Sequence, residues 1–484
     1  MLFNSFSFLI FFPVVVTIYF VMPHRFRWAW LLAASCYFYM AFIPVYILIL
    51  FFTIGIDYVA GILIEDATGR RRKSLLIVSI IANVGVLAVF KYFNFLNANA
   101  HAVADVFNLP YDFGPLAIIL PIGLSFHTFQ AMSYTIEVYR GRQKAERHLG
   151  IYALYVMFFP QLVAGPIERP QNLLHQFYER HVFDYDRVTS GLRRMAYGLL
   201  LKVVIADRLA GYVNVVYDNP ATYKGLSFVV ATIFFAFQIY CDFAGYSYMA
   251  IGAAEVMGFR LMRNFNRPYL ARSISEFWSR WHISLSTWFR DYVYIPLGGN
   301  RVSRPRWYFN LLGTFFLSGL WHGANWTFVI WGTLNGLYLF SSLMTTQFRE
   351  AVARATSIAA HPRVRAASGV LFTFALTCFA WTFFRAPSIG DALYIIRSML
   401  TVPVPHDVIP DALRAEGFTK FGVAYSGMLI VALMIFEHVC TRVNFPRLFA
   451  AQPGWIRWST YYAGCMAIWL LGISSEKAFI YFQF

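Results

Sequence analysis

Long stretches without Asp, Glu, Lys or Arg follow one another along most of this chain. About 20 apolar residues are enough to span the hydrocarbon core of a bilayer, and a charge near its centre costs several kcal/mol. Of the 484 residues, 59% are hydrophobic and only 13% are charged, which excludes a soluble multidomain protein. The sequence therefore predicts an all-α polytopic membrane protein.

The charge-free runs mark where the chain is expected to cross the membrane. The run 307–348 is long enough for two helices, and Pro44 is expected to divide the run that begins at Trp28. We expect a single domain over residues 1–484, with roughly ten to twelve transmembrane helices plus re-entrant segments. The runs cover residues 1–23, 28–56, 75–90, 113–136, 149–167, 225–240, 307–348, 366–384, 421–436 and 458–475.

Residues 161–170, QLVAGPIERP, combine Gly and two Pro residues within an apolar context. This composition predicts irregular backbone. A membrane tolerates irregular backbone only where it lines protein or a water-filled cavity. The segment therefore indicates a central chamber, around which the helices are expected to pack.

Basic residues gather in a few loops and predict the orientation. The net charge is +16, and Lys and Arg cluster in residues 69–73, 140–147, 260–306 and 349–365, whereas residues 97–115 have neither. Short loops rich in Lys and Arg stay in the cytoplasm. We therefore predict that the N- and C-termini both lie outside the cytoplasm. The apolar start lacks a basic region and a cleavage site, and is expected to be a retained first span.

Several kinds of chemistry lack their sequence signals. The five cysteines are dispersed without metal-ligand spacing, so no metal site or disulfide is expected. We find no phosphate-binding loop, no dinucleotide-binding glycine pattern, no H-E-x-x-H and no G-x-S-x-G. Cytoplasmic loops explain the basic excess, so nucleic acid is not expected as a partner, whereas membrane lipids are. No bound cofactor is predicted.

Residues 277–301 form the first polar cluster in an apolar context. They include Arg280, His282 and Asp291 among several aromatic residues. On a continuous helix His282 and Ser286 would share one face, since they are four residues apart. The segment is expected to be an amphipathic or re-entrant element on the cytoplasmic side. The alternative is an interfacial helix anchored by Trp and Arg, in which a hydroxyl simply satisfies His282.

Residues 317–332 form the second cluster, LSGLWHGANWTFVIWG, around His322. Desolvation lowers the pKa of a histidine, so a buried His322 should be neutral and able to act as a general base. Asn325, three residues on, could hydrogen-bond a ring nitrogen or a substrate carbonyl. Gly319 and Gly323 would let another backbone or a thin substrate approach. The alternative is a packed, hydrogen-bonded histidine without a catalytic role.

At these clusters the chain resembles the membrane-bound O-acyltransferase (MBOAT) superfamily, in its bacterial polysaccharide O-acetylation branch of alginate O-acetylation (AlgI-like) proteins. The resemblance rests on residues 157–170, 280–301, 319–332, 383–387 and the opening FNSFSFLIFF. It implies the MBOAT fold, with His322 as the catalytic histidine and His282 as a second family histidine. Supporting or substrate-binding roles are then expected for Asn325, Arg280, Trp321 and Asp291.

The last six residues, FIYFQF, resemble a tail in the related teichoic acid D-alanylation system whose tyrosine is thought to accept the acyl group. The resemblance implies an acyl relay through Tyr481. A free terminus can reach into a chamber, and a phenol becomes a nucleophile when a base removes its proton. The alternative is an interfacial aromatic anchor beside the last helix.

Together these features predict an O-acyltransferase. Acetyl-CoA, or an acyl-carrier thioester, would donate an acetyl group from the cytoplasm past Arg280 and His282. A periplasmic acetyltransferase with a hydrolase-like (SGNH) serine site would then transfer it to a polysaccharide such as alginate. The alternatives are an acyl or polymer transporter, and a non-catalytic scaffold for periplasmic acetyltransferases. The sequence names neither the polymer nor the donor.

Overall fold

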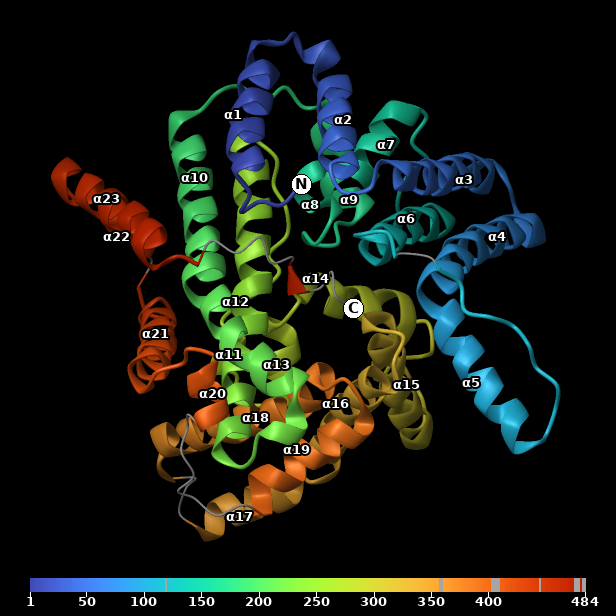
Figure 1. The fold of residues 1–484 in the computed structure, drawn as a ribbon. Helices are drawn as coiled ribbons and strands as arrows, with labels where there is room; N and C mark the ends of the chain where they lie inside the picture. Colours follow the sequence, from blue (N-terminus) through green and yellow to red (C-terminus); the bar gives the residue numbers. More distant parts are fainter. Residues whose placement is uncertain (118–119, 357–359, 402–409, 444, 474–478, 481–484) are drawn as a thin grey trace. The chain divides into compact units, whose positions relative to one another are not determined.

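The computed structural model describes residues 1–484 except 118–119, 357–359, 402–409, 444, 474–478 and 481–484 (Figure 1). Throughout these described residues the regular elements are helices, and none is a strand. The predicted all-α class is therefore confirmed. By its contacts the chain divides into two compact units, residues 1–195 with 246–263 and 481–484, and residues 196–245 with 264–480. The prediction of a single domain stays a prediction.

The first unit contains a series of antiparallel and crossing helices. Within it α3 packs against both α4 and α6, and α2 packs against α7 and α8. The first unit comprises α1 (Phe6–Val21), α2 (His24–Met40), α3 (Ile47–Asp66), α4 (Gly69–Leu87), α5 (Phe93–Val106), α6 (Leu124–Tyr139), α7 (Leu149–Met157), α8 (Phe159–Leu162), α9 (Pro170–Leu173) and most of α10 (Tyr185–Leu200).

The second unit contains the two histidine clusters. Its helix hairpin of α15 and α16 packs on α18. The helices are α11 (Asp207–Asp218), much of α12 (Leu226–Met257), α13 (Ile274–Arg280), α14 (Ile283–Phe289), α15 (Arg304–His322), α16 (Trp326–Met344), α17 (Thr346–Ala355), α18 (Pro362–Arg385), α19 (Ile389–Thr401), α20 (Asp411–Ala415), α21 (Lys420–Val439), α22 (Phe445–Ala450) and α23 (Gly454–Leu471).

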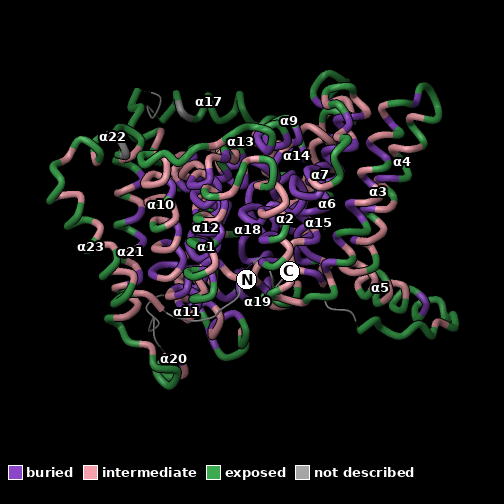
Figure 2. Tube along the Cα trace, turned by 90° about the horizontal axis from the view of Figure 1, so that it is seen from above, coloured by how far each residue is buried: buried purple, intermediate pink, exposed green. Residues whose placement is uncertain are grey.

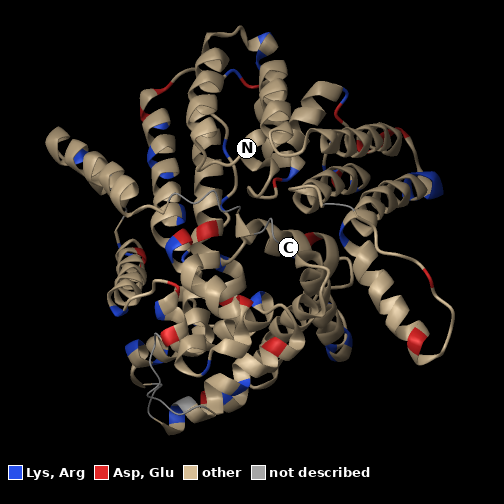
Figure 3. Cartoon of the chain, in the orientation of Figure 1, with Lys and Arg blue, Asp and Glu red and all other residues tan. Residues whose placement is uncertain are grey.

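Six helical stretches of the described chain are long and apolar enough to cross a membrane. Long helices are mostly free of charge along their length (Figure 3). The multi-pass character is confirmed, whereas the predicted count of ten to twelve crossings stays a prediction. The six are Pro44–Asp66, Gly69–Val106, Leu226–Met257, Trp326–Met344, Pro362–Arg385 and Lys420–Val439, and α1 is a shorter apolar helix.

Two predicted interruptions are confirmed. Pro44 begins a short 3-10 turn between α2 and α3. The run 307–348 forms the two helices α15 and α16, which separate at Gly323. The first break occurs at a proline, and at the second the backbone of Gly323 is extended.

The charge-free runs missed one long helix and cut another short. Residues 185–218 form a continuous helical stretch, α10, η4 (Leu201–Ala206) and α11, that includes Lys202 and Asp207. Helix α12 continues past Tyr240 through Asp242 to Met257. Lys202 Nζ lies 2.9 Å from carboxylate oxygens of Asp207 and of Asp242. Because these charges compensate one another, the helices can bury them, which a charge-free criterion cannot foresee.

Burial differs strongly among the apolar helices. In the apolar window of α12, 78% of residues are buried, compared with 22% in α21. In Figure 2 the path of α12 is largely purple, whereas α17 and α23 are mostly green and pink. Helix α12 is therefore surrounded by protein, and α21 presents most of its apolar surface outward.

The segment after α8 has the irregular backbone that the sequence predicted. Residues 163–169 are not helical, yet nearly all of them are buried. Glu168 holds this segment, because its carboxylate accepts hydrogen bonds from the Met262 backbone N–H and the Asn172 side chain. The Tyr155 hydroxyl donates to the Glu168 carbonyl at 3.0 Å. Hydrogen bonds within the protein therefore satisfy buried polar groups of this loop, which would otherwise be costly to remove from water.

The hairpin of α15 and α16 depends on glycine. A Cβ at Gly319 would collide with the Phe328 carbonyl oxygen and lie 3.1 Å from the Cα of Gly332. The expected approach of another backbone at Gly319 is thus confirmed, with α16 as the partner. At Gly323 a Cβ would collide with the ring of Phe328.

Substitution of Gly319 should therefore destabilise the protein. Gly319→Ala is expected to cost about 1–3 kcal/mol, because α16 would have to move away. Gly313→Ala lies on the same helix, has nothing within 4 Å of its added Cβ, and should be neutral or stabilising by up to about 1 kcal/mol. Thermal unfolding of both purified variants in detergent measures the difference. Equal midpoints would contradict the close packing.

Candidate active site

His282 lies at a break in the backbone. Helix α13 ends at Arg280, Trp281 is extended, and His282 has φ 42° and ψ 55° before α14 begins. The expected continuous helix, with His282 and Ser286 on one face, is therefore wrong. Instead the His282 carbonyl accepts the Ser286 N–H at 2.9 Å at the start of α14. The left-handed conformation is uncommon for a residue other than glycine, and such strained positions gather at functional sites.

Asn264 fixes the protonation of the His282 ring. Its Oδ1 lies 3.1 Å from His282 Nδ1 and accepts the backbone N–H of Ser284 at 3.3 Å and the Ser284 hydroxyl at 2.9 Å. A backbone N–H can only donate, so the amide atom facing it is the oxygen. His282 Nδ1 therefore donates its hydrogen to Asn264, and the basic lone pair is on Nε2.

His282 is completely buried and neutral. Its exposed fraction is 0%, and the ring of Phe243 meets it edge-on with centroids 4.6 Å apart. His282 lies between α13 and α14, which are not among the candidate membrane-spanning helices. Burial lowers the pKa of His282 to about 3, because the charged imidazolium loses its hydration. The ring is thus uncharged at neutral pH, and its Nε2 can accept a hydrogen bond.

His322 is the last residue of α15 and is 4% exposed. Gly323 is extended, and Asn325 caps the next helix by accepting the Thr327 N–H at 3.0 Å. Asn325 also donates to the Pro387 carbonyl at 3.3 Å. Because the helix ends at His322, the expected helical relation between His322 and Asn325 is wrong. The role of Asn325 as a helper of His322 stays a prediction.

Aromatic rings surround the His322 imidazole and connect it with His282. The centroid of His322 lies 4.8 Å from that of Trp331, in an edge-to-face arrangement, and 5.5 Å from that of Phe384. Trp321 contacts both imidazoles, with centroid distances of 4.9 Å to His322 and 6.3 Å to His282. One buried indole thus neighbours both histidines, which elements far apart in the sequence bring together.

The other predicted supporting residues lie on the short helices of the same unit. Arg280 pairs with Glu276 at 2.5 Å, one turn earlier in α13. Asp291 lies in the π-helical turn after α14, and its carboxylate contacts the neighbouring Arg290 at 2.8 Å. Their expected roles toward the donor stay predictions.

Tyr481 lies outside the described residues, but the two residues before it are described. Phe479 and Ile480 are 2% and 3% exposed. The ring of Phe479 packs against Phe243 at a centroid distance of 5.4 Å, and Phe243 in turn contacts His282. These two tail residues are therefore buried against an aromatic neighbour of His282.

Sequence reasoning missed three residues of this cluster: Asn264, Phe243 and Asp242. Asn264 belongs to no motif and precedes His282 by 18 residues. Its signal was one of two asparagines, Asn264 and Asn266, in a basic, Arg-rich loop, which does not by itself indicate an imidazole partner. Phe243 is one of 50 phenylalanines. Only the three-dimensional structure distinguishes it.

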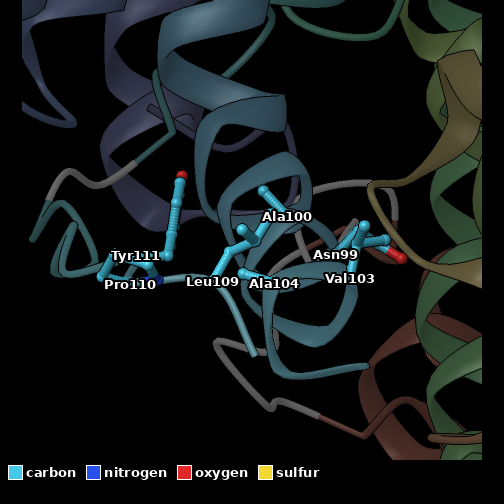
Figure 4. A pocket seen from close by; sticks show the side chains of 7 residues that line it. All are labelled: Asn99, Ala100, Val103, Ala104, Leu109, Pro110 and Tyr111. Carbon is cyan, nitrogen blue, oxygen red and sulfur yellow. The ribbon is translucent and has the colours of Figure 1, made fainter. Parts of the chain in front are cut away.

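The central chamber stays a prediction. Figure 4 shows a pocket of about 430 Å³ elsewhere, at the end of α5 in the first unit. Its walls are mainly apolar, and neither histidine belongs to it. The lining residues are Asn99, Ala100, Val103, Ala104, Leu109, Pro110 and Tyr111.

Comparison with known proteins establishes the family. Residues 142–385 match MBOAT, the membrane-bound O-acyltransferase family. The chain is 41% identical to a probable alginate O-acetylase AlgI of Pseudomonas aeruginosa, over 83% of this chain and 75% of that protein. The chain belongs to the membrane-bound O-acyltransferase family. The expected resemblance is thus confirmed.

Further MBOAT relatives match nearly the whole chain. A probable alginate O-acetylase AlgI of Azotobacter vinelandii is 40% identical over 94% of this chain and 86% of its own length. The peptidoglycan O-acetyltransferase of Helicobacter pylori is 33% identical over 94% and 91%. This MBOAT protein is therefore a membrane acyltransferase. Both histidines lie inside the family match, whereas the tail lies beyond it.

The environment of His282 predicts a graded effect of two substitutions. Asn264→Ala leaves three buried donors, His282 Nδ1–H, the Ser284 N–H and the Ser284 hydroxyl, without their acceptor, at about 1–3 kcal/mol each. Ser284→Ala removes a donor and should cost only about 1 kcal/mol. Thermal unfolding of the purified variants measures both. If Asn264→Ala were as stable as Ser284→Ala, Asn264 would not hold the ring.

Proposed function

We propose that this MBOAT protein moves an acetyl group from a cytoplasmic thioester across the membrane for O-acetylation of a polysaccharide. His322 is the general base, and Tyr481 on the C-terminal tail is the first acceptor. The observation that carries the proposal is the aromatic cluster of the second unit. In it one indole contacts both histidines, and the buried tail residue Phe479 packs on a neighbour of His282.

The chemistry needs one base and one nucleophile. His322 takes the phenol proton of Tyr481 while the phenol oxygen bonds to the thioester carbonyl carbon. The tetrahedral intermediate collapses with breakage of the C–S bond, and the imidazolium returns the proton to the leaving thiolate. The products are an acetyl ester on Tyr481 and a free thiol. Asn325, Trp321, Arg280 and Asp291 support or bind the substrates in this scheme.

The buried surroundings of the two imidazoles support these roles. Rings of Trp331 and Phe384 pack against the buried His322 imidazole, and a site closed by aromatic rings limits hydrolysis of the thioester. His282, with its hydrogen directed at Asn264, presents Nε2 as an acceptor. We assign His282 a positioning role on the donor side, since it lies beside the short helix that carries Arg280.

The names of the relatives support a polysaccharide as the acceptor. Two of them are named alginate O-acetylases and one a peptidoglycan O-acetyltransferase, so the acceptor class is an extracytoplasmic polysaccharide such as alginate. The donor, acetyl-CoA or an acyl carrier, is cytoplasmic. The protein then lies in the bacterial inner membrane with both termini periplasmic. A periplasmic SGNH-like acetyltransferase would accept the group from Tyr481 and transfer it to a sugar hydroxyl.

Removal of the proposed base should abolish transfer. With labelled acetyl-CoA and the purified full chain, His322→Ala is expected to lose at least about 100-fold in acetyl transfer, the scale of general-base catalysis. His282→Ala should show a partial defect, mainly in its dependence on donor concentration. His101→Ala, an exposed histidine on α5, is the matched control and should transfer normally. Full transfer by a folded His322→Ala variant would refute the assignment and favour a scaffold.

The relay makes a separate prediction at the tail. Tyr481→Phe retains the aromatic ring and removes only the nucleophilic oxygen, so the mass of one acetyl group should no longer appear on the intact protein. Tyr462→Phe, on the exposed face of α23, should acquire it normally. Peptide mapping of the wild type should locate the acetyl group on Tyr481. Normal transfer to an acceptor by Tyr481→Phe would replace the relay with direct transfer.

A further inference from the structure

The C-terminal segment is fastened to the helical stretch 185–218 before it reaches the tail. Arg208 donates to the carbonyl of Leu471, the last residue of α23, at 2.8 Å. The Ile473 N–H donates to the Val203 carbonyl at 2.9 Å. Val203 lies in η4, a π-helical turn, a kind of irregularity that is frequent at functional sites. The residues that follow α23 are therefore hydrogen-bonded to η4.

The same π-helical turn carries a buried ion cluster. Lys202 lies in η4, Asp207 begins α11, and Asp242 lies in α12. The Lys202 ammonium is 2.9 Å from an oxygen of each carboxylate, and all three side chains are at most 6% exposed. The backbones pack closely beside this ion cluster: a Cβ at Gly245 would lie only 2.7 Å from the Gly198 carbonyl oxygen.

One oxygen of this cluster holds the tail. Asp242 uses Oδ1 for Lys202 and Oδ2 to accept the backbone N–H of Ile480 at 2.9 Å. Next to it, Phe479 packs on Phe243, the residue that follows Asp242 in α12. A buried hydrogen bond to a carboxylate is about twice as strong as a neutral one. Asp242 and Phe243 thus bind the backbone and side chain of adjacent tail residues.

We propose that Asp242, held by Lys202, is a positioning residue that seats the C-terminal tail for acyl transfer. The inference rests on the proposed relay, because Ile480 directly precedes Tyr481. A chain terminus is poorly ordered unless it is fastened. A backbone hydrogen bond fixes the tail whatever its side chains are, and the ion pair keeps the acceptor charged. Asp242 does not touch the reacting atoms.

The tail offers a way to test this without disturbing the ion cluster. Ile480→Pro removes the N–H that Asp242 accepts. Ile480→Ala is the matched control, since it also loses the Ile480 side chain but keeps the N–H. In the purified full chain with acetyl-CoA, Ile480→Pro should acetylate Tyr481 about tenfold more slowly than Ile480→Ala. Both variants should remain folded, which thermal unfolding of each checks.

A second pair of variants addresses the carboxylates. Asp242→Ala and Asp207→Ala each remove one partner of Lys202, but only Asp242 accepts the tail N–H. Hydrogen exchange of the C-terminal peptide should accelerate at least about tenfold in Asp242→Ala relative to Asp207→Ala. This exchange measurement does not depend on any acyl transfer, so it keeps the test informative if acetylation is absent.

The outcomes separate the two proposals. No acetyl group on Tyr481 in the wild type, with slow exchange that depends on Asp242, would refute the relay and leave Asp242 as the tail's anchor. Acetylation of Tyr481 at equal rates in Ile480→Pro and Ile480→Ala would refute the positioning role and leave the relay. Equal exchange in Asp242→Ala and Asp207→Ala would refute the anchor itself.

Discussion

The ion pairs of Lys202 with Asp207 and Asp242 are the interaction on which the second unit depends. Each of these charges alone would be too costly to bury among apolar helices, whereas one ammonium shared by two carboxylates offsets much of that cost. The pairing joins η4, α11 and α12, and α12 is the most buried of the six candidate membrane spans of the described chain. Its second carboxylate oxygen then binds the backbone beside the tail tyrosine. Asp242 therefore belongs both to the buried ion cluster and to the proposed seat of the tail.

The two imidazoles obtain their surroundings by different local means. His282 follows a helix that ends early, and its left-handed backbone turns the ring toward Asn264 and away from a helical face. His322 ends a helix whose close packing on α16 requires Gly319. Both devices use helix termini, where side chains are not confined to the regular faces of a helix. The result is two buried imidazoles that share Trp321 as a neighbour.

This arrangement suits an acyltransferase whose donor and final acceptor lie on opposite sides of a membrane. A thioester is stable enough to be delivered and reactive enough to be attacked once a base removes the proton of the nucleophile. In the proposed mechanism, the aromatic rings around His322 limit the competing attack by water. In the proposed relay, a nucleophile on the protein's own terminus would also spare the enzyme from drawing a large polymer into the membrane, since only a small acyl group would have to cross.

Much of the fold could be predicted from local sequence patterns. Apolar runs predicted the helical membrane class, Pro44 and residues 307–348 predicted interruptions, and 161–170 predicted irregular backbone, because each signal acts within a few residues. The motifs around His282 and His322 led to the family. Helical spacing failed at both histidines, since it assumes a continuous helix where the backbone is broken.

The sequence by itself determined that the chain is a helical membrane protein of the MBOAT family, and which histidines to examine. Only the tertiary structure decided that Asn264 orients His282, that Trp321 lies beside both imidazoles, and that Lys202 and two aspartates lie together. A linear criterion treats every charge as an end to a membrane helix. The free-energy cost of burying a charge depends on the partners of that charge. Lys202 and Asp242 become neighbours only when the chain folds.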